Sequence, residues 1–314
     1  MDSVRRLLPA ALAVALSTLA CGQEFAGVED GAAGSGGAGN VDAGAGERSG
    51  GAAGRGGMGA AGDATLGGKP PLGGQGGSGG DPVVEAPPIP LEGLELWLRA
   101  DHEVGEVGGV VSSWKDGSQH GRDALQTEAG FRPKMVEGAL SGKPALVFDG
   151  VDDFLELPEL DADISQGVSM FIAFEQQALG TCGAWFEASN GRELQELHFG
   201  DWQSSVIYEI AESWINDTDF PLLMAEPQIT GAIHGADKLV KLRTNGSSAG
   251  QGMVTLSPAG LTRKYVYVGK TLYTDCAYFK GSIGEILLYS RPVTSQEMLD
   301  IEGYLQSKWA CCGQ

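Results

Sequence analysis

The stretch Ser282-Ile-Gly-Glu-Ile-Leu-Leu-Tyr289 is a short, mostly apolar run of the kind that forms a buried β-strand. Similar runs recur from Leu91 onward, and they are separated by Gly, Asp, Asn and Ser. The others cover residues 94–98, 110–114, 145–149, 154–157, 169–174, 184–187, 205–210, 230–233, 239–243 and 265–268. So many short runs predict an all-β fold, and a two-sheet antiparallel jelly-roll sandwich suits their number.

One helix is predicted, directly after these strands. Thr294-Ser-Gln-Glu297 is a capping box, in which the threonine hydroxyl accepts from the Glu297 amide and the glutamate carboxylate accepts from the Thr294 amide. The apolar residues that follow at helical spacing are Met298, Ile301, Leu305 and Trp309. They predict a C-terminal helix with one face packed on the sandwich.

The glycines divide the chain into parts. The sequence has 314 residues and 50 Gly, and about half of these glycines fall between residues 26 and 80. That stretch offers almost no large apolar side chain, so burial cannot offset the entropy of ordering it. We therefore expect a signal peptide at residues 1–20, a disordered Gly-rich linker at 21–90 and one folded domain at 91–314.

The first residues are typical of an export signal. Arg5 and Arg6 precede the apolar run 7–16, which is too short to span a bilayer comfortably. Ser17-Thr-Leu-Ala-Cys21 resembles a bacterial lipobox, and this resemblance implies that Cys21 carries the lipid anchor. Gly22, where inner-membrane lipoproteins have Asp, favours the outer membrane or cell surface. An ordinary cleaved secretory signal remains the alternative.

The charge balance limits the choice of ligand. The chain carries 21 Lys and Arg against 41 Asp and Glu, a net charge of −20. So acidic a chain repels phosphate backbones, which argues against nucleic-acid binding. Sugars and divalent ions remain possible ligands, although a solvated acidic surface that keeps a secreted domain soluble explains the charge equally well.

Several stretches of the expected domain are similar to the laminin-G-like family of the concanavalin A-like lectin/glucanase superfamily. They are Gly93-Leu-Glu-Leu-Trp-Leu-Arg-Ala-Asp101, Val111-Ser-Ser-Trp-Lys-Asp116, Gly121-Arg-Asp-Ala124, Arg132-Pro133, Phe148-Asp-Gly-Val-Asp-Asp-Phe154 and the run from Phe279 to Arg291. Their order and spacing carry the resemblance. It implies a jelly-roll scaffold and a lectin-like, extracytoplasmic binding module.

The sequence lacks the patterns expected of an enzyme on this fold. Retaining glucanases of this fold place their two carboxylates in a Glu-x-Asp-x-Glu pattern on one strand, and no such pattern occurs. The closest glutamate pairs are three residues apart, which puts their side chains on opposite faces of a strand. There is no Gly-x-Ser-x-Gly elbow, and His102, His120, His198 and His234 lie in no recognisable triad. We expect no catalytic activity.

Aromatic side chains interleaved with acids are typical of sugar sites, because the rings stack on pyranose faces. The candidates are Trp185, Trp202, Tyr208 and Trp214. A core role for at least half of them is the alternative. The expected function is a non-catalytic envelope lipoprotein whose ligand is a carbohydrate or glycoprotein. A structural envelope protein with a protein partner, or a divergent glycoside hydrolase, is the alternative.

The turn Asp149-Gly-Val-Asp152-Asp153 has two interpretations. Its carboxylates can hydrogen-bond the turn backbone, or they can contribute oxygens to a Ca²⁺ ion, which needs six to eight. No other cofactor is indicated.

Four cysteines besides Cys21 fit no zinc motif, and in an oxidising compartment they predict disulfides. One arrangement links Cys182 and Cys276 each to one of Cys311 and Cys312, but all three pairings of four cysteines stay open.

Overall fold

The computed structural model describes residues 88–192, 194–211, 213–276 and 278–309, without the side chains of 217–220. The chain divides into two units, Met1–Val83 and Val84–Gln314, and the described residues belong to the second. The signal peptide, Cys21, the linker up to residue 87, Cys311 and Cys312 lie outside them. Among the described residues, no helix has the length and apolar character needed to cross a membrane.

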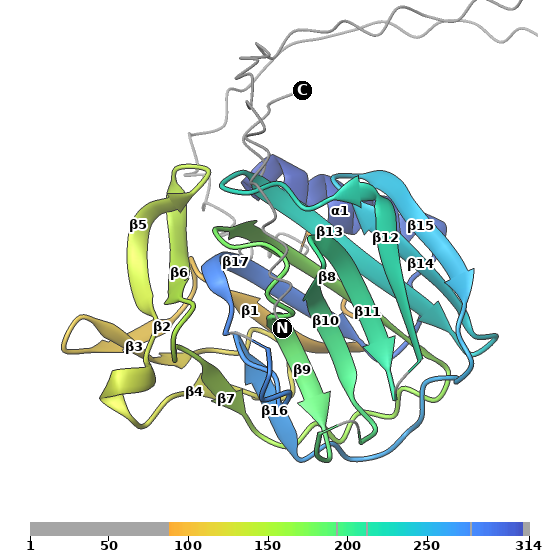
Figure 1. The fold of residues 1–314 in the computed structure, drawn as a ribbon, viewed down its shortest axis with the longest axis horizontal. Coiled ribbons are helices and arrows are strands. Elements are labelled where there is room, and N and C mark those ends of the chain that lie inside the picture. Colours follow the sequence, from red (N-terminus) through yellow and green to blue (C-terminus); the bar gives the residue numbers. More distant parts are fainter. Residues whose placement is uncertain (1–87, 193, 212, 277, 310–314) are drawn as a thin grey trace, which may run out of the picture. The chain divides into compact units, whose positions relative to one another are not determined.

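Two antiparallel β-sheets form the fold (Figure 1), which confirms the predicted two-sheet sandwich with a C-terminal helix. The first sheet has eight described strands in the order β15-β14-β13-β8-β17-β6-β5, and β1 also pairs with β17. Its strands are β1 (Leu94–Arg99), β5 (Lys134–Leu140), β6 (Lys143–Asp149), β8 (Gly167–Gln176), β13 (Pro227–Gly235), β14 (Leu239–Thr244), β15 (Ser247–Met253) and β17 (Lys280–Tyr289).

The second sheet has nine described strands in the order β12-β11-β10-β9-β16-β7-β4-β3-β2. They are β2 (Val104–Val107), β3 (Val110–Trp114), β4 (Ala124–Leu125), β7 (Leu155–Leu157), β9 (Ala184–Ser189), β10 (Leu197–Trp202), β11 (Ser205–Ile210), β12 (Ser213–Pro221) and β16 (Tyr265–Val268). One turn of 3₁₀ helix, η1 (Ala129–Phe131), precedes β5.

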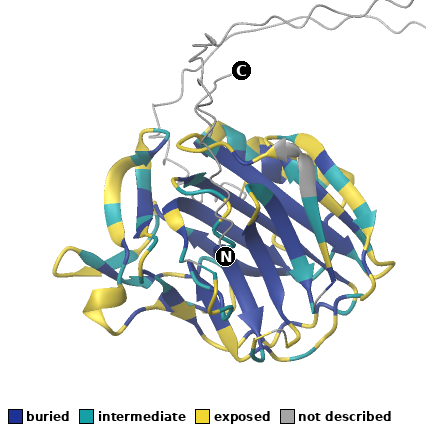
Figure 2. Ribbon diagram, viewed as in Figure 1, coloured by how far each residue is buried: buried dark blue, intermediate teal, exposed yellow. Residues whose placement is uncertain are grey.

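The core lies between the sheets, where the strands are almost entirely buried (Figure 2). Phe174 of β8 and Trp185 of β9 meet across the interface with their ring centroids 4.3 Å apart. Nearby, the Tyr208 hydroxyl of β11 lies 2.9 Å from Nδ1 of His234 of β13. Burial raises the pKa of Tyr208 far above its usual range, so this hydroxyl stays neutral. The two sheets are therefore joined by aromatic packing and by several polar contacts in the core, which include hydrogen bonds from Trp185 Nε1 to Gln176 at 3.1 Å and from Gln176 Nε2 to Asp201 at 2.9 Å.

The C-terminal helix α1 (Ser295–Trp309) begins as predicted. The Glu297 amide donates to the Thr294 hydroxyl at 3.2 Å, and the Thr294 amide donates to the Glu297 carboxylate at 2.8 Å, which confirms the capping box. Arg291 also donates to this carboxylate, and its hydrogen bond is the main reason why the pKa of Glu297 falls to about 2. Ile301, Leu305 and Trp309 are buried, as predicted, and Met298 is half-buried.

A buried carboxylate fixes α1 to the sheet. Glu285 of β17 is fully buried and accepts hydrogen bonds from four side chains of β1 and α1. These donors are Trp97 Nε1 at 2.5 Å, Tyr304 Oη at 3.0 Å, Lys308 Nζ at 3.0 Å and Trp309 Nε1 at 2.7 Å. Burial alone would lower the pKa of Lys308, but the Glu285 charge and hydrogen bonds to Asp101 and Tyr304 raise it above its usual value.

The residue before this glutamate allows the close approach of the helix. A Cβ atom at Gly284 would lie 2.7 Å from Leu140 Cδ2 and 2.8 Å from the Trp309 ring. Because real Cβ atoms do not approach other heavy atoms so closely, only glycine lets the indole pack directly on β17.

Replacing Glu285 by Gln should destabilise the protein by about 3 kcal/mol or more, because the amide removes the buried negative charge that faces Lys308 and puts an NH₂ donor where one carboxylate oxygen accepts two hydrogen bonds. Urea denaturation measures this loss. Glu137→Gln, at an exposed glutamate of β5, is the matched control and should change the stability by less than about 0.5 kcal/mol. Equal stability of both variants would contradict the role of Glu285.

The Tyr208–His234 contact predicts a pH-dependent stability. Burial lowers the pKa of His234 to about 4, whereas an unperturbed histidine titrates near about 6.5. Between these values the unfolded chain binds the proton more readily than the folded protein, so this histidine lowers the stability as the pH falls. The difference in unfolding free energy between the wild-type protein and His234→Gln should therefore shrink between about pH 7 and about pH 4.5. A difference that stays constant would rule out this assignment.

Candidate functional site

A row of side chains crosses the outer face of the nine-stranded sheet. Antiparallel pairing places Glu187 opposite His198, His198 opposite Glu209, and Glu209 opposite Trp214. On the other side, Tyr267 of β16 pairs with Glu187. Residues directly opposite each other share a face, so these five side chains form one continuous row, which we call the outer row.

The loop that follows β16 closes over one end of the outer row. This cover segment, residues 269–276, donates a hydrogen bond from the Leu272 amide to Glu187 at 3.1 Å. Its Tyr273 ring meets the His198 ring edge to face, with centroids 6.4 Å apart. As a result Glu187 is only 1% exposed and His198 only 4%, although both lie on the outer face of the sheet.

A disulfide between Cys182 and Cys276 ties the cover segment to the loop before β9. The expectation that each of these cysteines pairs with Cys311 or Cys312 is therefore wrong. The two sulfur atoms belong to loops at the same end of the nine-stranded sheet, next to the outer row, and their residues are 94 positions apart in the sequence. Sequence spacing alone could not reveal that neighbourhood.

The uncovered part of the outer row opens into a hollow of about 310 Å³, which we call the outer hollow. This volume is at the lower end of the range for small-molecule sites. Its floor comes from β10, β11 and β12, and its wall from the cover segment and residues near β9. The lining residues are Cys182, Arg192, His198, Trp202, Ile207, Glu209, Trp214, Tyr273, Asp275 and Cys276.

The charges around the outer hollow are mostly negative. Glu187 accepts hydrogen bonds from the Leu272 amide and from Ser189, and its carboxylate lies 3.4 Å from His198 Nδ1. Burial acts to raise the pKa of Glu187, but the hydrogen bond and charge of His198 hold it below its usual value. Arg192 lies 3.3 Å from Asp275 and over the Tyr273 ring. Its positive charge is thus already shared with an acidic neighbour.

The structure separates the four aromatic residues proposed from the sequence into two pairs. Trp202 and Trp214 are 40% and 53% exposed and both line the outer hollow. Trp185 and Tyr208 are buried in the core, so their assignment to a ligand site is wrong. A β-bulge in the β9–β10 pairing turns Trp185 inward. Tyr208 shares the inner face of β11 with Val206 and Ile210, which are two residues away on either side.

Sequence reasoning missed several lining residues, among them Arg192, His198, Tyr273 and Asp275. Arg192 and Tyr273 belong to loops that come together only through the fold. The sequence places His198 in no recognisable triad and suggests no other role for it. Its position between two glutamates of neighbouring strands was visible only from the strand register.

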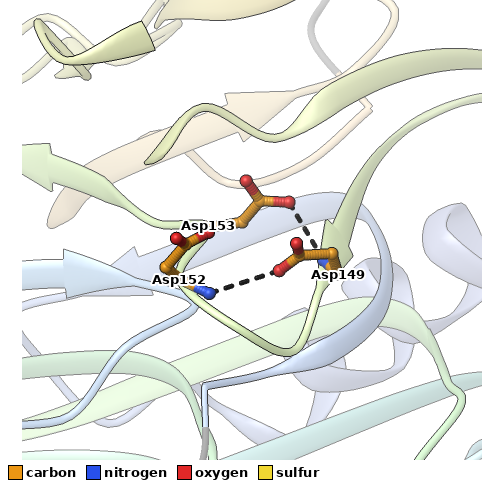
Figure 3. Close-up of side chains that lie close together, drawn as sticks. All are labelled: Asp149, Asp152 and Asp153. Atoms are coloured by element: carbon orange, nitrogen blue, oxygen red, sulfur yellow. Dashed lines mark hydrogen bonds between the residues drawn. The ribbon is translucent and has the colours of Figure 1, made fainter. Parts of the chain in front are cut away.

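The acidic turn between β6 and β7 gathers Asp149, Asp152 and Asp153, with one oxygen of each within 4.8 Å of the others (Figure 3). Asp149 accepts from the Val151 and Asp152 amides, and Asp153 accepts from the Asp149 amide at 3.0 Å. Burial raises the pKa of Asp153 to about 6. These hydrogen bonds account for Asp149 and Asp153 as supports of the turn. With one oxygen from each of the three carboxylates, a Ca²⁺ ion would need further oxygen ligands from the backbone or from water.

A larger hollow, of about 780 Å³, lies between Pro88–Pro90 and one side of α1. Its lining includes Leu299, Asp300 and Tyr304. It lacks the paired exposed indoles of the outer hollow, so we place the candidate site at the outer hollow.

Comparison with known proteins supports the fold and identifies no family. No protein-family model matches this sequence, and no curated protein matches it. Among solved structures, domain 4 of the extracellular GH43 arabinanase AbnA from Geobacillus stearothermophilus, in complex with arabinotriose, is similar with a TM-score of 0.50 and 14% identity. The match covers 67% of this chain and 98% of that domain.

Two further structures align less closely. The binding domain of Paraclostridial Mosquitocidal Protein 1 has a TM-score of 0.48 and 9% identity, over 68% of this chain and 52% of that one. Trypanosoma rangeli sialidase has a TM-score of 0.47 and 15% identity, over 71% of this chain and 34% of that one, so the match spans about a third of its length. At these identities the likeness to the arabinanase domain shows a β-sandwich fold and nothing more.

Proposed function

We propose that this sandwich is a non-catalytic carbohydrate-binding module, and that its ligand occupies the outer hollow. The observation that carries the proposal is the pair of exposed indoles, Trp202 and Trp214, at a polar hollow. Both indoles line one hollow, so their apolar faces are available to a ligand bound there. Indole faces next to carboxylate and imidazole groups match the alternating apolar faces and hydroxyl edges of sugars.

The construction of the outer hollow supports binding by a rigid site. Its floor is a hydrogen-bonded sheet, and the disulfide between Cys182 and Cys276 fixes its wall. Sites on such elements hold their contact groups in place before the ligand arrives, which reduces the entropy lost on binding. The similarity to a domain solved with arabinotriose is compatible with this proposal, although that likeness concerns the fold.

Two features support binding without catalysis. A glycosidase general acid needs a raised pKa so that it is protonated at working pH, whereas the pKa of the most buried carboxylate of the outer row, Glu187, is lowered. The oxygens of Glu187 also accept hydrogen bonds from Ser189 and Leu272 beneath the cover segment. This carboxylate is placed to support the wall of the hollow.

The laminin-G-like, concanavalin A-like relationship forms a second part of the proposal. Three of the stretches that carry this resemblance lie in β1, at the turn after β6, and in β17, and two others lie in β3 and at β4 of the nine-stranded sheet. The first three are neighbours, because β17 pairs with both β1 and β6. A shared packing unit of this kind is compatible with common descent of the scaffold, while the outer hollow lies on the other sheet.

Trp214→Ala and Trp202→Ala should each weaken binding to the glycan that the wild-type protein selects on a glycan array by at least about tenfold. The reason is the loss of the stacking face. Isothermal titration, run with Ca²⁺ and with a chelator, measures the change. Tyr265→Ala removes an aromatic residue of similar exposure that does not line the outer hollow, and it should bind like the wild-type protein.

Three results would count against the proposal. Binding to no glycan under either condition would refute carbohydrate recognition. A single stoichiometric protein partner recovered by cross-linking, in place of a glycan, would favour a structural envelope role. Release of reducing sugar from the bound polysaccharide at high protein concentration would indicate a glycosidase.

We further propose that the module is displayed outside the cytoplasm, at the outer membrane or cell surface, on a lipid attached to Cys21. The support is the sequence Ser17-Thr-Leu-Ala-Cys21 after a short apolar run. Attached acyl chains stabilise membrane binding by about 0.8 kcal/mol per buried methylene.

Cys21→Ser should therefore move the protein from the membrane fraction to the soluble extracytoplasmic fraction. Immunoblotting after cell fractionation detects the change. Gln23→Ser, two positions away, is the control and should leave the protein in the membrane fraction. Membrane association that survives Cys21→Ser would exclude this anchor.

A further inference from the structure

The two exposed tryptophans of the outer hollow are set apart along a diagonal of the sheet. Trp214 of β12 pairs directly with Glu209 of β11, and Glu209 pairs directly with His198 of β10. Trp202 lies four residues further along β10, where it pairs with Ser205. The indoles therefore stand two strands apart in one direction and four residues apart in the other.

Strand geometry converts this register into a distance. Four residues advance a strand by about 13 Å, and two strand spacings add nearly 10 Å, so the two Cα atoms lie about 16 Å apart. Side chains on a strand stand roughly perpendicular to the sheet, so the indoles keep most of this separation. A single sugar ring is no larger than an aromatic side chain and cannot contact both indoles.

The surface between the indoles suits the middle of a chain ligand. Gly200 lies on the same face of β10 between His198 and Trp202, and the backbone of Gly183 and Ala184 occupies the place that a Cβ atom would take. Its neighbour Ile207 on β11 is almost completely buried. The polar groups of His198 and Glu209 follow at the Trp214 end. A ligand laid along the diagonal thus meets an indole, the backbone packed against Gly200, polar groups and a second indole in turn.

The charges select against acidic sugars. Among the described lining residues, Glu209 and Asp275 are acidic and Arg192 and His198 are basic, and His198 lies 3.4 Å from the Glu187 carboxylate. Arg192 already lies 3.3 Å from Asp275. The buried carboxylate of Glu187 lies beneath this wall, and the whole chain has a net charge of −20. A uronate or sialate would meet an unfavourable potential without a cation free of acidic neighbours to offset it.

We propose that the outer hollow binds an internal stretch of at least three linked neutral sugar rings, laid diagonally across β10, β11 and β12 with one indole near each end. Each linked ring advances a chain by roughly one strand spacing, about 5 Å, so three rings span the diagonal. This inference rests on the proposed carbohydrate-binding function and adds the length and charge class of the ligand.

The test is a titration series with oligosaccharides of one to five residues from the neutral polysaccharide that binds best among cellulose, xylan, starch and arabinan. The affinity should rise at least tenfold between the monosaccharide and the trisaccharide or tetrasaccharide and then level off. Trp202→Ala and Trp214→Ala should each remove most of this gain and leave the monosaccharide affinity nearly unchanged. Oligogalacturonides of equal length should bind at least tenfold more weakly than the neutral series.

Controls separate this inference from the function on which it rests. Tyr265→Ala should keep the full dependence on length, and circular dichroism checks that every variant is folded. Equal affinity for monosaccharide and tetrasaccharide, or tighter binding of the oligogalacturonide, would overturn the three-ring neutral site while carbohydrate binding stands. Binding to none of the polysaccharides or oligosaccharides would overturn both.

Discussion

A single buried carboxylate, that of Glu285, joins three parts of the fold that are far apart in sequence. Its four hydrogen-bond donors come from the first strand and the last helix, and the glutamate itself lies on the last strand. A carboxylate can be kept in the interior only if its oxygens are fully satisfied, since the cost of removing the charge from water is several kcal/mol. The network therefore depends on β1, β17 and α1 being correctly placed at the same time.

This arrangement determines where a ligand can bind. The helix occupies the outer face of the eight-stranded sheet, so that face is closed by packing between α1, β14 and β17. The outer face of the nine-stranded sheet has no helix over it in the described structure, and the cover segment protects only its Glu187 end. The open remainder, over β10 to β12, is where the exposed tryptophans lie. Polar side chains of the outer row, such as Glu209, face the hollow here and take no part in the packing of the core.

Much of the fold could be predicted from the sequence, because apolar runs and the capping box act locally. The runs at 94–98, 169–174 and 282–289 became β1, β8 and β17, and α1 begins after Thr294. Strands β2, β4, β5, β10, β12 and β15 were not among the predicted runs. β2, β5, β12 and β15 lie at sheet edges, and their sequences, such as Ser-Ser-Ala-Gly-Gln-Gly-Met in β15, lack an apolar alternation. β4 has two residues, and β10 is an interior strand whose run Leu-His-Phe-Gly-Asp-Trp is interrupted by polar residues and glycine.

The candidate site was predicted less well, because it depends on register. Strict alternation would put Trp185 on the face of Glu187, but the bulge opposite Phe199 and Gly200 reverses its direction. Tyr208 could have been assigned to the core, since Val206 and Ile210 on either side are apolar. The position of Tyr273 beside His198 depends on a disulfide whose pairing four cysteines leave undetermined.

That disulfide also bears on the timing of ligand capture. A loop free to open and close must be ordered at each encounter, which slows association or weakens the complex. Here one covalent bond orders the cover segment once, when the cysteines oxidise, and every later ligand meets the same wall. Residence time at the outer hollow should then depend on the stacking and polar contacts with the ligand, because the disulfide holds the wall in one position.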